Sequence, residues 1–571
     1  MAGRSEIVVR FAGEGGQGVV TAAEMLARAA TGVGYHALTF ATFPSQILGG
    51  PTWTQARVSR SEVLSPGDEI DILVAFNDYA YREHRTEVRD GGVILLDPAV
   101  TPDPSDHTHR CITVPFDELA KQTGESRAAN MVVMGGLSRL VNMPLAFFKD
   151  FVTARFAGRE GVVEANHKAL DLGLAHLSEE DPIADLGKPE RPQYLQSFIK
   201  GNEAVAIGAL HAGIDTYIGY PISPATPILV YMERNLTGEG KVAIQASSEI
   251  ESITSILGAG FAGKKAMTAT SGPGFTLMAE GIGLGWMAEI PCVIVDVQRG
   301  GPATGLPTKT EQSDLLTAIY PAHGDSRMPV IAPGTVEECF YGAVMAFNWA
   351  ERYQGPVMLL SEHSLAERAQ NVPKPDLSKV PVENRQVYDG RNGYLRYEAP
   401  KISPYPVPGK PGAYVANGSE HDVYGDTTHL PKYHVHMTER RFSKLALLED
   451  GDYEADNRGA KVALMPWGGS KGSALESYNL LVEQGIDLGW YYTMYVSPLP
   501  KKMLEELRTK DLVIVPELNF QGQMAGLLRS QGVKAEAITQ YTGLPFGARN
   551  LAKRIKAMLT KAGERTGAVK A

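Results

Sequence analysis

The pattern of apolar and polar positions along this chain switches repeatedly between that of a buried strand and that of an amphipathic helix. Residues 241–274 show the switch most clearly, because the runs KVAIQA and KKAMTATS each predict a strand and a Gly-Pro-Gly turn follows the second. Between them, four apolar positions recur at the helical spacings of three and four: Ile250, Ile253, Leu257 and Phe261. This stretch is therefore typical of half an α/β unit.

The same pattern recurs over most of the 571 residues and predicts an α/β fold with three α/β domains. Polar, proline-bearing stretches without either period interrupt it. We therefore expect five parts: a domain over residues 1–180, a linker over 181–200, a domain over 201–385, an extended connector over 386–457 and a domain over 458–571.

Two carboxylates stand at the start of the helix predicted within residues 241–274. Ser248 and Glu251 fit a capping box, in which each side chain satisfies a backbone N–H at the helix start. Glu249 is not used by that box, and it lies at a strand-to-helix junction, where open α/β sheets bind ligands. It is either a functional carboxylate or a plain partner of the helix dipole.

A glycine-rich loop, GEGGQG at residues 13–18, follows a predicted strand and precedes a predicted helix. Such a loop either lets an anion approach the helix N-terminus or lets helix and sheet pack closely. A dinucleotide site of the nicotinamide type also needs an acidic residue about twenty positions later, and none is present there. The loop therefore leaves phosphate binding open and argues against a nicotinamide cofactor.

Three further segments carry candidate chemistry at strand ends. The loop YPISPATP at residues 220–227 holds three prolines, which stiffen it into either a capped turn or one wall of a pocket. Arg299 ends a predicted strand before a glycine turn, where it could bind a carboxylate or could pair with Asp296 at the surface. Lys309 follows in the next loop.

Composition removes several function classes. The formal net charge of −10 does not favour a nucleic-acid surface or an anionic membrane, and no apolar run reaches the roughly 18 residues of a membrane span. The three cysteines are far apart without a C-x-x-C, so neither disulfides nor an iron–sulfur or zinc site is expected, and a reducing cytoplasm fits. His421 and His429 lack ligand spacing, so no metal site is predicted.

Five segments taken together resemble the α subunit of 2-oxoacid:ferredoxin oxidoreductases, closest to the 2-oxoglutarate type with a γ domain fused at its N-terminus. They are GEGGQG (13–18), YPISPAT (220–226), TATSGPG (268–274), QRGGPAT (298–304) and LPTKTEQ (306–312). The resemblance covers nearly the whole chain. It implies a γ-type domain over 1–180, a thiamine-pyrophosphate pyrimidine-binding domain over 201–385 and a transketolase C-terminal-like domain over 458–571. The family loop usually reads YPITPST; here Ser223 keeps a hydroxyl and Ala225 loses one.

The resemblance also implies roles for individual residues. Glu249 matches by position the glutamate that bonds the cofactor's ring nitrogen, and Arg299 matches the residue that binds the substrate C1 carboxylate. Ser223 would hydrogen-bond the reacting end of the substrate, and Lys309 is our own candidate for the distal carboxylate of 2-oxoglutarate. Other residues expected at the cofactor are Tyr220, Pro221, Ile222, Thr270 and Ser271.

The implied reaction is the oxidative decarboxylation of 2-oxoglutarate to succinyl-CoA and CO2, with coenzyme A as co-substrate and electrons passed to ferredoxin. The chain lacks a G-D-G motif for diphosphate and magnesium, and it lacks a cysteine cluster. A β subunit with Mg²⁺ and a [4Fe–4S] cluster is therefore expected to share the thiamine pyrophosphate, with (αβ)2 as the family assembly. Alternatives are a pyruvate- or indolepyruvate-type relative and a non-catalytic nucleotide-binding scaffold.

Overall fold

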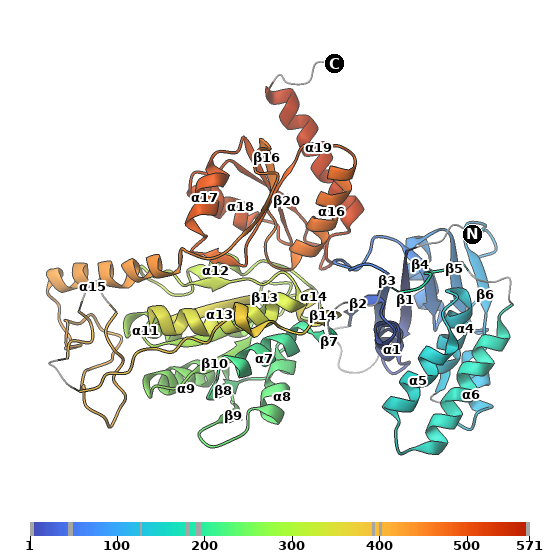
Figure 1. Ribbon diagram of the computed structural model, residues 1–571, viewed down its shortest axis with the longest axis horizontal. Helices are drawn as coiled ribbons and strands as arrows, with labels where there is room; N and C mark the ends of the chain where they lie inside the picture. Colours follow the sequence, from blue (N-terminus) through green and yellow to red (C-terminus); the bar gives the residue numbers. More distant parts are fainter. Residues whose placement is uncertain are drawn as a thin grey trace. The chain divides into compact units, whose positions relative to one another are not determined.

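The computed structural model describes residues 5–43, 50–125, 128–178, 183–189, 196–390, 394–398 and 402–566. The chain forms two compact units (Figure 1): Met1–Ile199 with Arg368–Lys374, and Lys200–Glu367 with Pro375–Ala571. Three sheets of eight, seven and five strands, each flanked by helices, confirm the predicted α/β fold.

The first unit is built on the eight-stranded sheet, whose strand order is β6-β5-β4-β1-β3-β2-β14-β7. Its strands are β1 (Glu6–Glu14), β2 (His36–Thr42), β3 (Pro51–Ser59), β4 (Ile70–Ala75), β5 (Val88–Leu96), β6 (Arg110–Thr113), β7 (Gln196–Lys200) and β14 (Ala369–Pro373). The pairs of β1 with β4, β4 with β5 and β5 with β6 are parallel, whereas β3 runs antiparallel to both β1 and β2. The sheet is therefore mixed.

Helices cover this sheet with a buried apolar core. They are α1 (Val19–Gly32), α2 (Asp78–His84), α3 (Phe116–Lys121), α4 (Ala129–Leu140), α5 (Leu145–Arg155) and α6 (Glu160–His176), with a 3-10 turn at Arg85–Glu87. The backbones of α4 and α6 touch, since a Cβ added to Gly135 would lie 2.1 Å from the Leu170 carbonyl oxygen. A Cβ on Gly173 would lie 1.9 Å from that of Val132. Glycine is therefore required at this helix crossing.

Two features of the first unit lie beyond the sequence-based expectations. Strand β14 comes from residues inside the domain predicted over 201–385, yet it pairs with β2 of the first sheet. The predicted linker contains β7 at its end, while its residues 181–182 and 190–195 lie outside the described part of the chain. The domain boundaries themselves stay predictions.

The second unit contains the seven-stranded sheet, in the order β18-β12-β13-β11-β10-β8-β9. Its strands are β8 (Thr216–Gly219), β9 (Val242–Gln245), β10 (Ala266–Thr270), β11 (Cys292–Gln298), β12 (Val330–Ile331), β13 (Pro356–Glu362) and β18 (Tyr495–Ser497). Its helices are α7 (Gly201–His211), α8 (Thr226–Asn235), α9 (Glu249–Phe261), α10 (Gly272–Leu277), α11 (Ala279–Met287), α12 (Leu315–Ile319), α13 (Val336–Tyr353) and α14 (His363–Ala366). The strand, helix and strand predicted within 241–274 are confirmed as β9, α9 and β10.

The five-stranded sheet of the second unit has the order β15-β17-β16-β19-β20. Its strands are β15 (Glu454–Asp456), β16 (Val462–Leu464), β17 (Gly489–Tyr492), β19 (Leu512–Glu517) and β20 (Ala535–Thr539). Helices α16 (Lys471–Glu483), α17 (Lys501–Arg508), α18 (Gln523–Ser530) and α19 (Ala548–Thr566) flank it. Strand β18, from the same part of the chain, pairs instead with β12 of the larger sheet.

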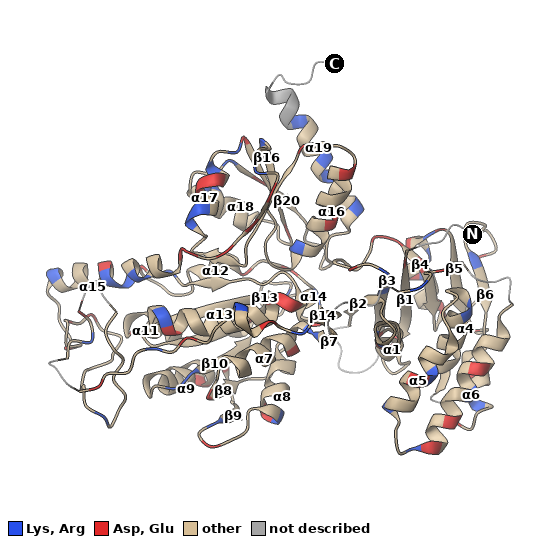
Figure 2. Ribbon diagram, viewed as in Figure 1, with Lys and Arg blue, Asp and Glu red and all other residues tan. Residues whose placement is uncertain are grey.

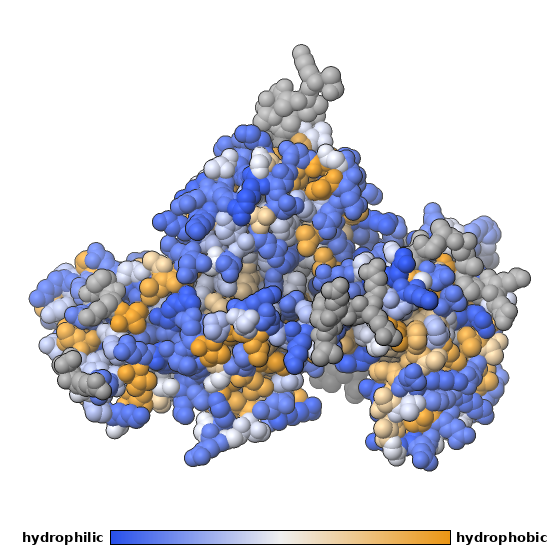
Figure 3. All heavy atoms as spheres, viewed as in Figure 1, coloured by the Kyte–Doolittle hydropathy of each residue, from blue (hydrophilic) through white to orange (hydrophobic). Residues whose placement is uncertain are grey.

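Charged residues of both signs are interspersed along both units, in keeping with a modest net charge (Figure 2). Apolar residues also reach the surface of each unit on the face drawn in Figure 3. Ile250 at the start of α9 is 56% exposed, and Leu277 at the end of α10 is 53% exposed.

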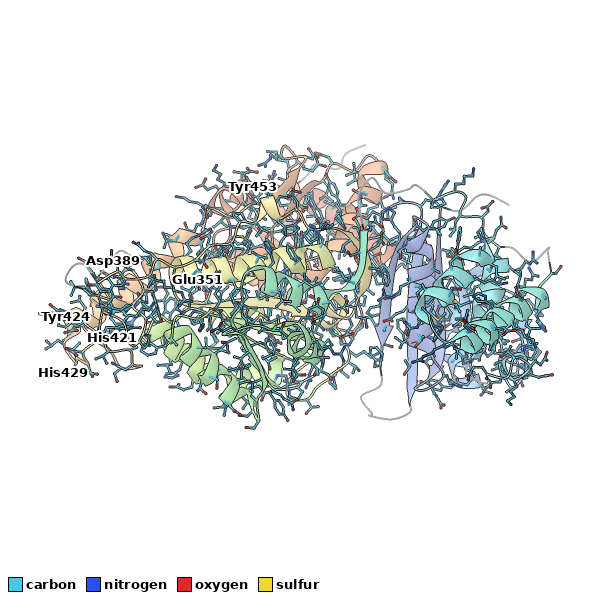
Figure 4. All side chains as sticks on the ribbon, turned by 60° about the horizontal axis from the view of Figure 1, so that its bottom comes forward. Glu351, Asp389, His421, Tyr424, His429 and Tyr453 are labelled. Carbon is cyan, nitrogen blue, oxygen red and sulfur yellow. The ribbon has the colours of Figure 1, made fainter. Side chains whose placement is uncertain are left out.

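The segment predicted as an extended connector, 386–457, also holds a helix that the sequence analysis missed, α15 (Pro431–Ser443). Part of it packs around the buried carboxylate of Glu289. Arg440 donates to both oxygens of Glu289 at 2.9 and 3.0 Å, and Lys444 Nζ donates at 2.8 Å. Figure 4 shows Asp389, His421, Tyr424 and His429 gathered in this segment. Buried ion pairs to Glu289 therefore hold the 386–457 segment against the part of the second unit that contains the seven-stranded sheet.

We expect Lys444→Met to destabilise the second unit by about 3–5 kcal/mol, because it removes a donor from a carboxylate that stays buried. The shift in the urea unfolding midpoint measures this effect. Lys534→Met is the matched control, since Lys534 is exposed and lies 4.0 Å from Asp511. The control should change stability by about 0.5 kcal/mol or less, and equal shifts in both variants would contradict the assignment.

Candidate active site

The predicted site segments meet at the carboxyl ends of neighbouring parallel strands in the seven-stranded sheet. YPISPAT follows β8, TSGPG follows β10, and RGGP follows β11. Strand β10 lies between β8 and β11, with Thr270 opposite Asp296. This edge is where open α/β sheets bind ligands.

Arg299 and Ser223 come together at this edge. Arg299 is only 7% exposed, and its Nη1 donates to the backbone oxygen of Ser223 at 2.7 Å. Its Nε has no hydrogen-bond partner among the described residues. The alternative of a surface arginine paired with Asp296 is therefore wrong: the side chain is buried, and the two residues form no ion pair.

The loop after β8 is not a capped turn. No side chain caps α8, whose N-cap position is Ala225. The backbone oxygen of Ile222 accepts hydrogen bonds from the N–H groups of Ala225 and Thr226 at 2.8 and 3.0 Å. Tyr220 and Ser223 are exposed while Pro221 and Ile222 are half-buried, so this loop presents side chains outward from the strand end.

At the start of α9, the predicted capping box is only partly present. Ser248 Oγ accepts from the N–H of Glu251 at 3.2 Å, as expected for the N-cap. The carboxylate of Glu251, however, accepts from the N–H and hydroxyl of Ser247 at 2.7 and 2.6 Å. One oxygen thereby gains two donors from one residue, and these bonds lower the pKa of the Glu251 carboxyl. Glu251 is thus a structural residue. Its carboxylate bonds Ser247, one position before the predicted partner Ser248.

Glu249 has the opposite environment, because it is 5% exposed and has no hydrogen-bond donor among the described residues. A Cβ added to Gly274 would lie 2.3 Å from Glu249 Oε1 and 2.3 Å from Thr270 Oγ1. Gly274 therefore provides the space that the Glu249 carboxylate occupies, a function of the TATSGPG segment that the sequence did not reveal.

Several buried polar atoms near this edge of the sheet have no hydrogen-bond partner among the described residues. They are Thr268 Oγ1, Ser271 Oγ, both carboxylate oxygens of Asp296, Arg299 Nε, Asp314 Oδ2 and Ser361 Oγ. Most buried polar groups in proteins are hydrogen-bonded. A group of unpaired atoms on three adjacent strands and their loops is therefore typical of a site that holds a ligand or water.

Two acids lie near Arg299; the sequence analysis named Asp296 only as an alternative surface partner of Arg299, and it did not identify Asp314. Burial, reinforced by nearby Asp314, raises the pKa of Asp296 well above its usual range, although Arg299 opposes this shift. Burial, reinforced by Glu311, raises the pKa of Asp314 to about 6, again against Arg299. Burial in turn lowers the pKa of Arg299. The site therefore combines one buried cation with two acids that resist ionisation.

Lys309 belongs to the loop beside Arg299. Its backbone oxygen accepts from the N–H of Gly300 at 3.0 Å, and its stem lies against Gly543. Burial lowers the pKa of Lys309, and no carboxylate pairs with its ammonium in the described structure. Burial and the charge of Lys309 lower the pKa of His363 to about 4. Lys309 is therefore an unpaired cation available to an anion.

The first unit has a separate cavity of about 670 Å³ at the GEGGQG loop. Its described lining includes Gly16, Gln17, Gly18, Phe76, Phe116 and Asn130, together with the carboxylates of Asp97 and Asp117. Gly18, with φ 75°, directly precedes α1. The loop thus borders a real pocket, with aromatic and acidic walls.

Comparison with known proteins identifies the family. Residues 207–440 match the family model "Pyruvate flavodoxin/ferredoxin oxidoreductase, thiamine diP-bdg", and residues 8–176 match "Pyruvate ferredoxin/flavodoxin oxidoreductase". The chain is 31% identical to the 2-oxoglutarate oxidoreductase subunit KorA of Mycobacterium tuberculosis, over 97% of this chain and 91% of that protein. The chain belongs to the 2-oxoacid:ferredoxin oxidoreductase family. The resemblance found in the sequence is confirmed.

Other members extend the match over the whole chain. A 2-oxoacid:ferredoxin oxidoreductase α subunit of Aeropyrum pernix is 29% identical over 98% of this chain and 99% of its own. The 2-oxoglutarate:ferredoxin oxidoreductase of Magnetococcus marinus, solved with 2-oxoglutarate, coenzyme A and succinyl-CoA bound, is 36% identical, with a TM-score of 0.91. That match covers 97% of this chain and 99% of the other.

Two kinds of feature are absent from the described residues. No helix there is long and apolar enough to cross a bilayer. No group of three or more His, Cys, Asp or Glu side chains there is arranged to hold a metal ion. His421 is buried, with Nδ1 2.9 Å from the Ser419 oxygen and its ring beside Tyr397. It therefore has a packing role.

We expect Gly274→Ala to displace the Glu249 carboxylate, because the new methyl group would overlap it, at a cost of about 1–3 kcal/mol in stability. A crystal structure and a thermal melt of the variant test both effects. Gly258→Ala on α9 is the control, since a Cβ there meets nothing within 4 Å. It should stabilise the protein by about 0.5–1 kcal/mol, and an unmoved Glu249 carboxylate in Gly274→Ala would contradict the prediction.

Proposed function

We propose that this chain is the α subunit of a coenzyme A-dependent 2-oxoglutarate:ferredoxin oxidoreductase. The reaction is the oxidative decarboxylation of 2-oxoglutarate to succinyl-CoA and CO2, with electrons passed to ferredoxin. The observation that carries the proposal is the similarity, over 97% of the chain, to the Magnetococcus marinus enzyme solved with 2-oxoglutarate, coenzyme A and succinyl-CoA. The assignment of site residues below rests on the geometry at the sheet edge.

The described residues fit thiamine diphosphate at this edge. Glu249 is a buried carboxylate without a donor, and Ser271 Oγ is buried and unpaired. Both are polar groups that a nitrogen-rich ring would satisfy. When bound, the cofactor supplies the nucleophilic carbon for the 2-oxo group and takes up the electron pair left by CO2. We assign its aminopyrimidine ring to Tyr220, Pro221, Ile222, Glu249, Thr270 and Ser271.

Glu249 is our candidate for the catalytic proton-holding group. A carboxyl that bonds a ring nitrogen can share a proton with it, and a site with few other donors strengthens that bond. The room left by Gly274 supports this assignment, since it lets the carboxylate lie beside Thr270 at the end of β10.

Arg299 and Ser223 are our candidates for binding the reacting end of the substrate. Arg299 uses Nη1 for the Ser223 backbone and leaves Nε unpaired, so donors remain for a carboxylate. The exposed Ser223 hydroxyl adds a hydrogen bond at the same end. CO2 leaves uncharged, so decarboxylation removes the carboxylate that Arg299 binds, and Arg299 no longer holds that end of the substrate.

A partner subunit is part of the proposal. The Aeropyrum pernix relative is named as an α subunit and the Mycobacterium tuberculosis relative as a subunit, which supports a further chain. The exposed side chains of Ile250 and Leu277 line a hollow of about 670 Å³ next to the Glu249 helix start, as expected for a surface that another chain covers. We propose a β subunit that supplies Mg²⁺, the diphosphate site and a [4Fe–4S] cluster, in an (αβ)2 assembly.

Coenzyme A is assigned to the first unit. The cavity at the GEGGQG loop has room for part of it, and Phe76 and Phe116 offer apolar contact to an adenine or pantetheine group. Asp97 and Asp117 would repel phosphates, so the phosphate groups are better placed away from these carboxylates. A cytoplasmic location, which the cysteine pattern favours, stays part of the same proposal.

A pyruvate-type activity is the second candidate, because both matching family models are named for pyruvate enzymes. Lys309 discriminates between the two substrates. Only 2-oxoglutarate carries a distal carboxylate, which would pair with the unpaired, half-buried ammonium of Lys309.

Replacing Glu249 by Ala in the complex with its β partner should lower kcat about 10²–10⁴-fold, because the proton-holding group is lost. Viologen reduction with 2-oxoglutarate and coenzyme A under anaerobic conditions measures this loss. Glu251→Ala is the matched control, two residues along the same helix, with a carboxylate that accepts hydrogen bonds from Ser247. It should keep near-normal turnover, and an active Glu249→Ala complex would rule out the catalytic assignment.

Lys309→Met should raise KM for 2-oxoglutarate about 10–100-fold, the loss expected for one charged hydrogen bond, and leave kinetics with pyruvate unchanged. The same anaerobic assay with each 2-oxoacid gives both constants. The exposed control Lys534→Met should change neither. An equal rise in KM for both substrates would exclude Lys309 from distal-carboxylate binding and would favour a pyruvate-type activity.

A further inference from the structure

Two buried acids near Arg299 have no role in the mechanism proposed above. Asp296 lies on β11, opposite Thr270 of β10 and Leu360 of β13, and it is fully buried. Neither of its carboxylate oxygens has a hydrogen-bond partner in the described structure. An ionised carboxylate in such a place would be costly, so these atoms call for a functional explanation.

Asp314 reaches the same place from the loop before α12. Its N–H donates to Gln298 Oε1 at 3.0 Å, which fixes the residue beside the end of β11. Its Oδ2 is buried, unpaired and close to Gly272, where an added Cβ would lie 2.8 Å from it. Gly272 therefore admits the Asp314 carboxylate, as Gly274 admits that of Glu249.

We propose that Asp296 and Asp314 take up one proton when the C1 carboxylate of a 2-oxoacid binds at Arg299, and release it when that carboxylate leaves as CO2. The proton comes from solvent and returns to solvent, so no bond of the substrate is made or broken by the pair. The inference rests on the proposed role of Arg299. Both acids are positioning residues that act through the charge of that guanidinium.

Charge balance in a buried site requires such a step. The charged groups that act on the acid pair in the described structure are Arg299, at the end of β11, and Glu311, in the loop before Asp314. Without substrate, one ionised acid balances the guanidinium. A substrate carboxylate would add an uncompensated negative charge in a poorly solvated place, and uptake of a proton removes it.

The pKa shifts of the two acids agree with this order of proton uptake and release. Burial and the nearby Asp314 raise the pKa of Asp296 well above its usual range, which favours the protonated form of this fully buried acid. Burial and Glu311 raise the pKa of Asp314 to about 6 against the opposing charge of Arg299, so this acid is mostly ionised at pH 7. A substrate carboxylate bound to Arg299 cancels the attraction between Arg299 and the Asp314 carboxylate. The pKa of Asp314 then rises above neutral pH. Proton uptake is therefore expected near pH 7 and should decrease toward pH 5, which lies below the pKa of Asp314.

The test is calorimetric titration of the α–β complex with N-oxalylglycine, a 2-oxoglutarate analogue whose amide carbonyl resists attack. Repeating the titration at pH 7 in buffers of different ionisation enthalpy gives the number of protons taken up with the ligand. We expect up to one proton in the wild-type complex, and a Kd that rises by up to about tenfold per pH unit above pH 7. Asp314→Asn should bind the analogue without uptake and with little pH dependence.

Asp511→Asn, which removes an exposed acid from the same unit, should keep the wild-type uptake. If Asp314→Asn does not fold, the wild-type pH series decides, since proton uptake must decrease steeply from pH 7 to pH 5. A complex that turns over 2-oxoglutarate but binds the analogue without uptake at any pH overturns the proton coupling alone, as does uptake retained in Asp314→Asn. A complex that neither turns over 2-oxoglutarate nor binds the analogue overturns this inference together with the proposed function.

Discussion

The buried guanidinium of Arg299 is the constraint on which the candidate site depends. A positive charge at the end of β11, almost removed from water, needs compensation from its surroundings. The chain provides a backbone carbonyl from Ser223 and the field of two acids, but no direct ion pair. Because this compensation is partial, the guanidinium can still bind an external carboxylate. A direct salt bridge within the chain would already occupy its N–H donors.

The glycines of the TATSGPG segment act through the volume that they leave free. Gly272 lies against the carboxylate of Asp314, and Gly274 lies against that of Glu249. Two acids from distant parts of the chain therefore converge on one short turn after β10. A side chain at either position would push an acid away, so these two glycines shape the site without contributing a functional group to it.

Local pattern predicted the parts of this structure that depend on neighbours in sequence. The β9, α9 and β10 elements and the Ser248 cap are set by spacings of a few residues. The meeting of Ser223 and Arg299 followed from family motifs. The addition of β14 to the first sheet and the fastening of the 386–457 segment by Glu289 could not be predicted, because they join residues far apart in sequence. The burial of Asp296 was missed for the same reason.

The contrast between Glu249 and Glu251 shows why chemistry alone could not assign the site. Successive residues of an α-helix are about 100° apart around its axis, so positions two apart project to nearly opposite sides. One side of α9 meets Gly274 and the sheet edge, where the carboxylate of Glu249 finds no donor. The other meets solvent and Ser247, which satisfies Glu251 twice. A carboxylate already bonded by its own helix start has little left to offer a ligand, so the unpaired and buried one of the two is the group that a cofactor can use.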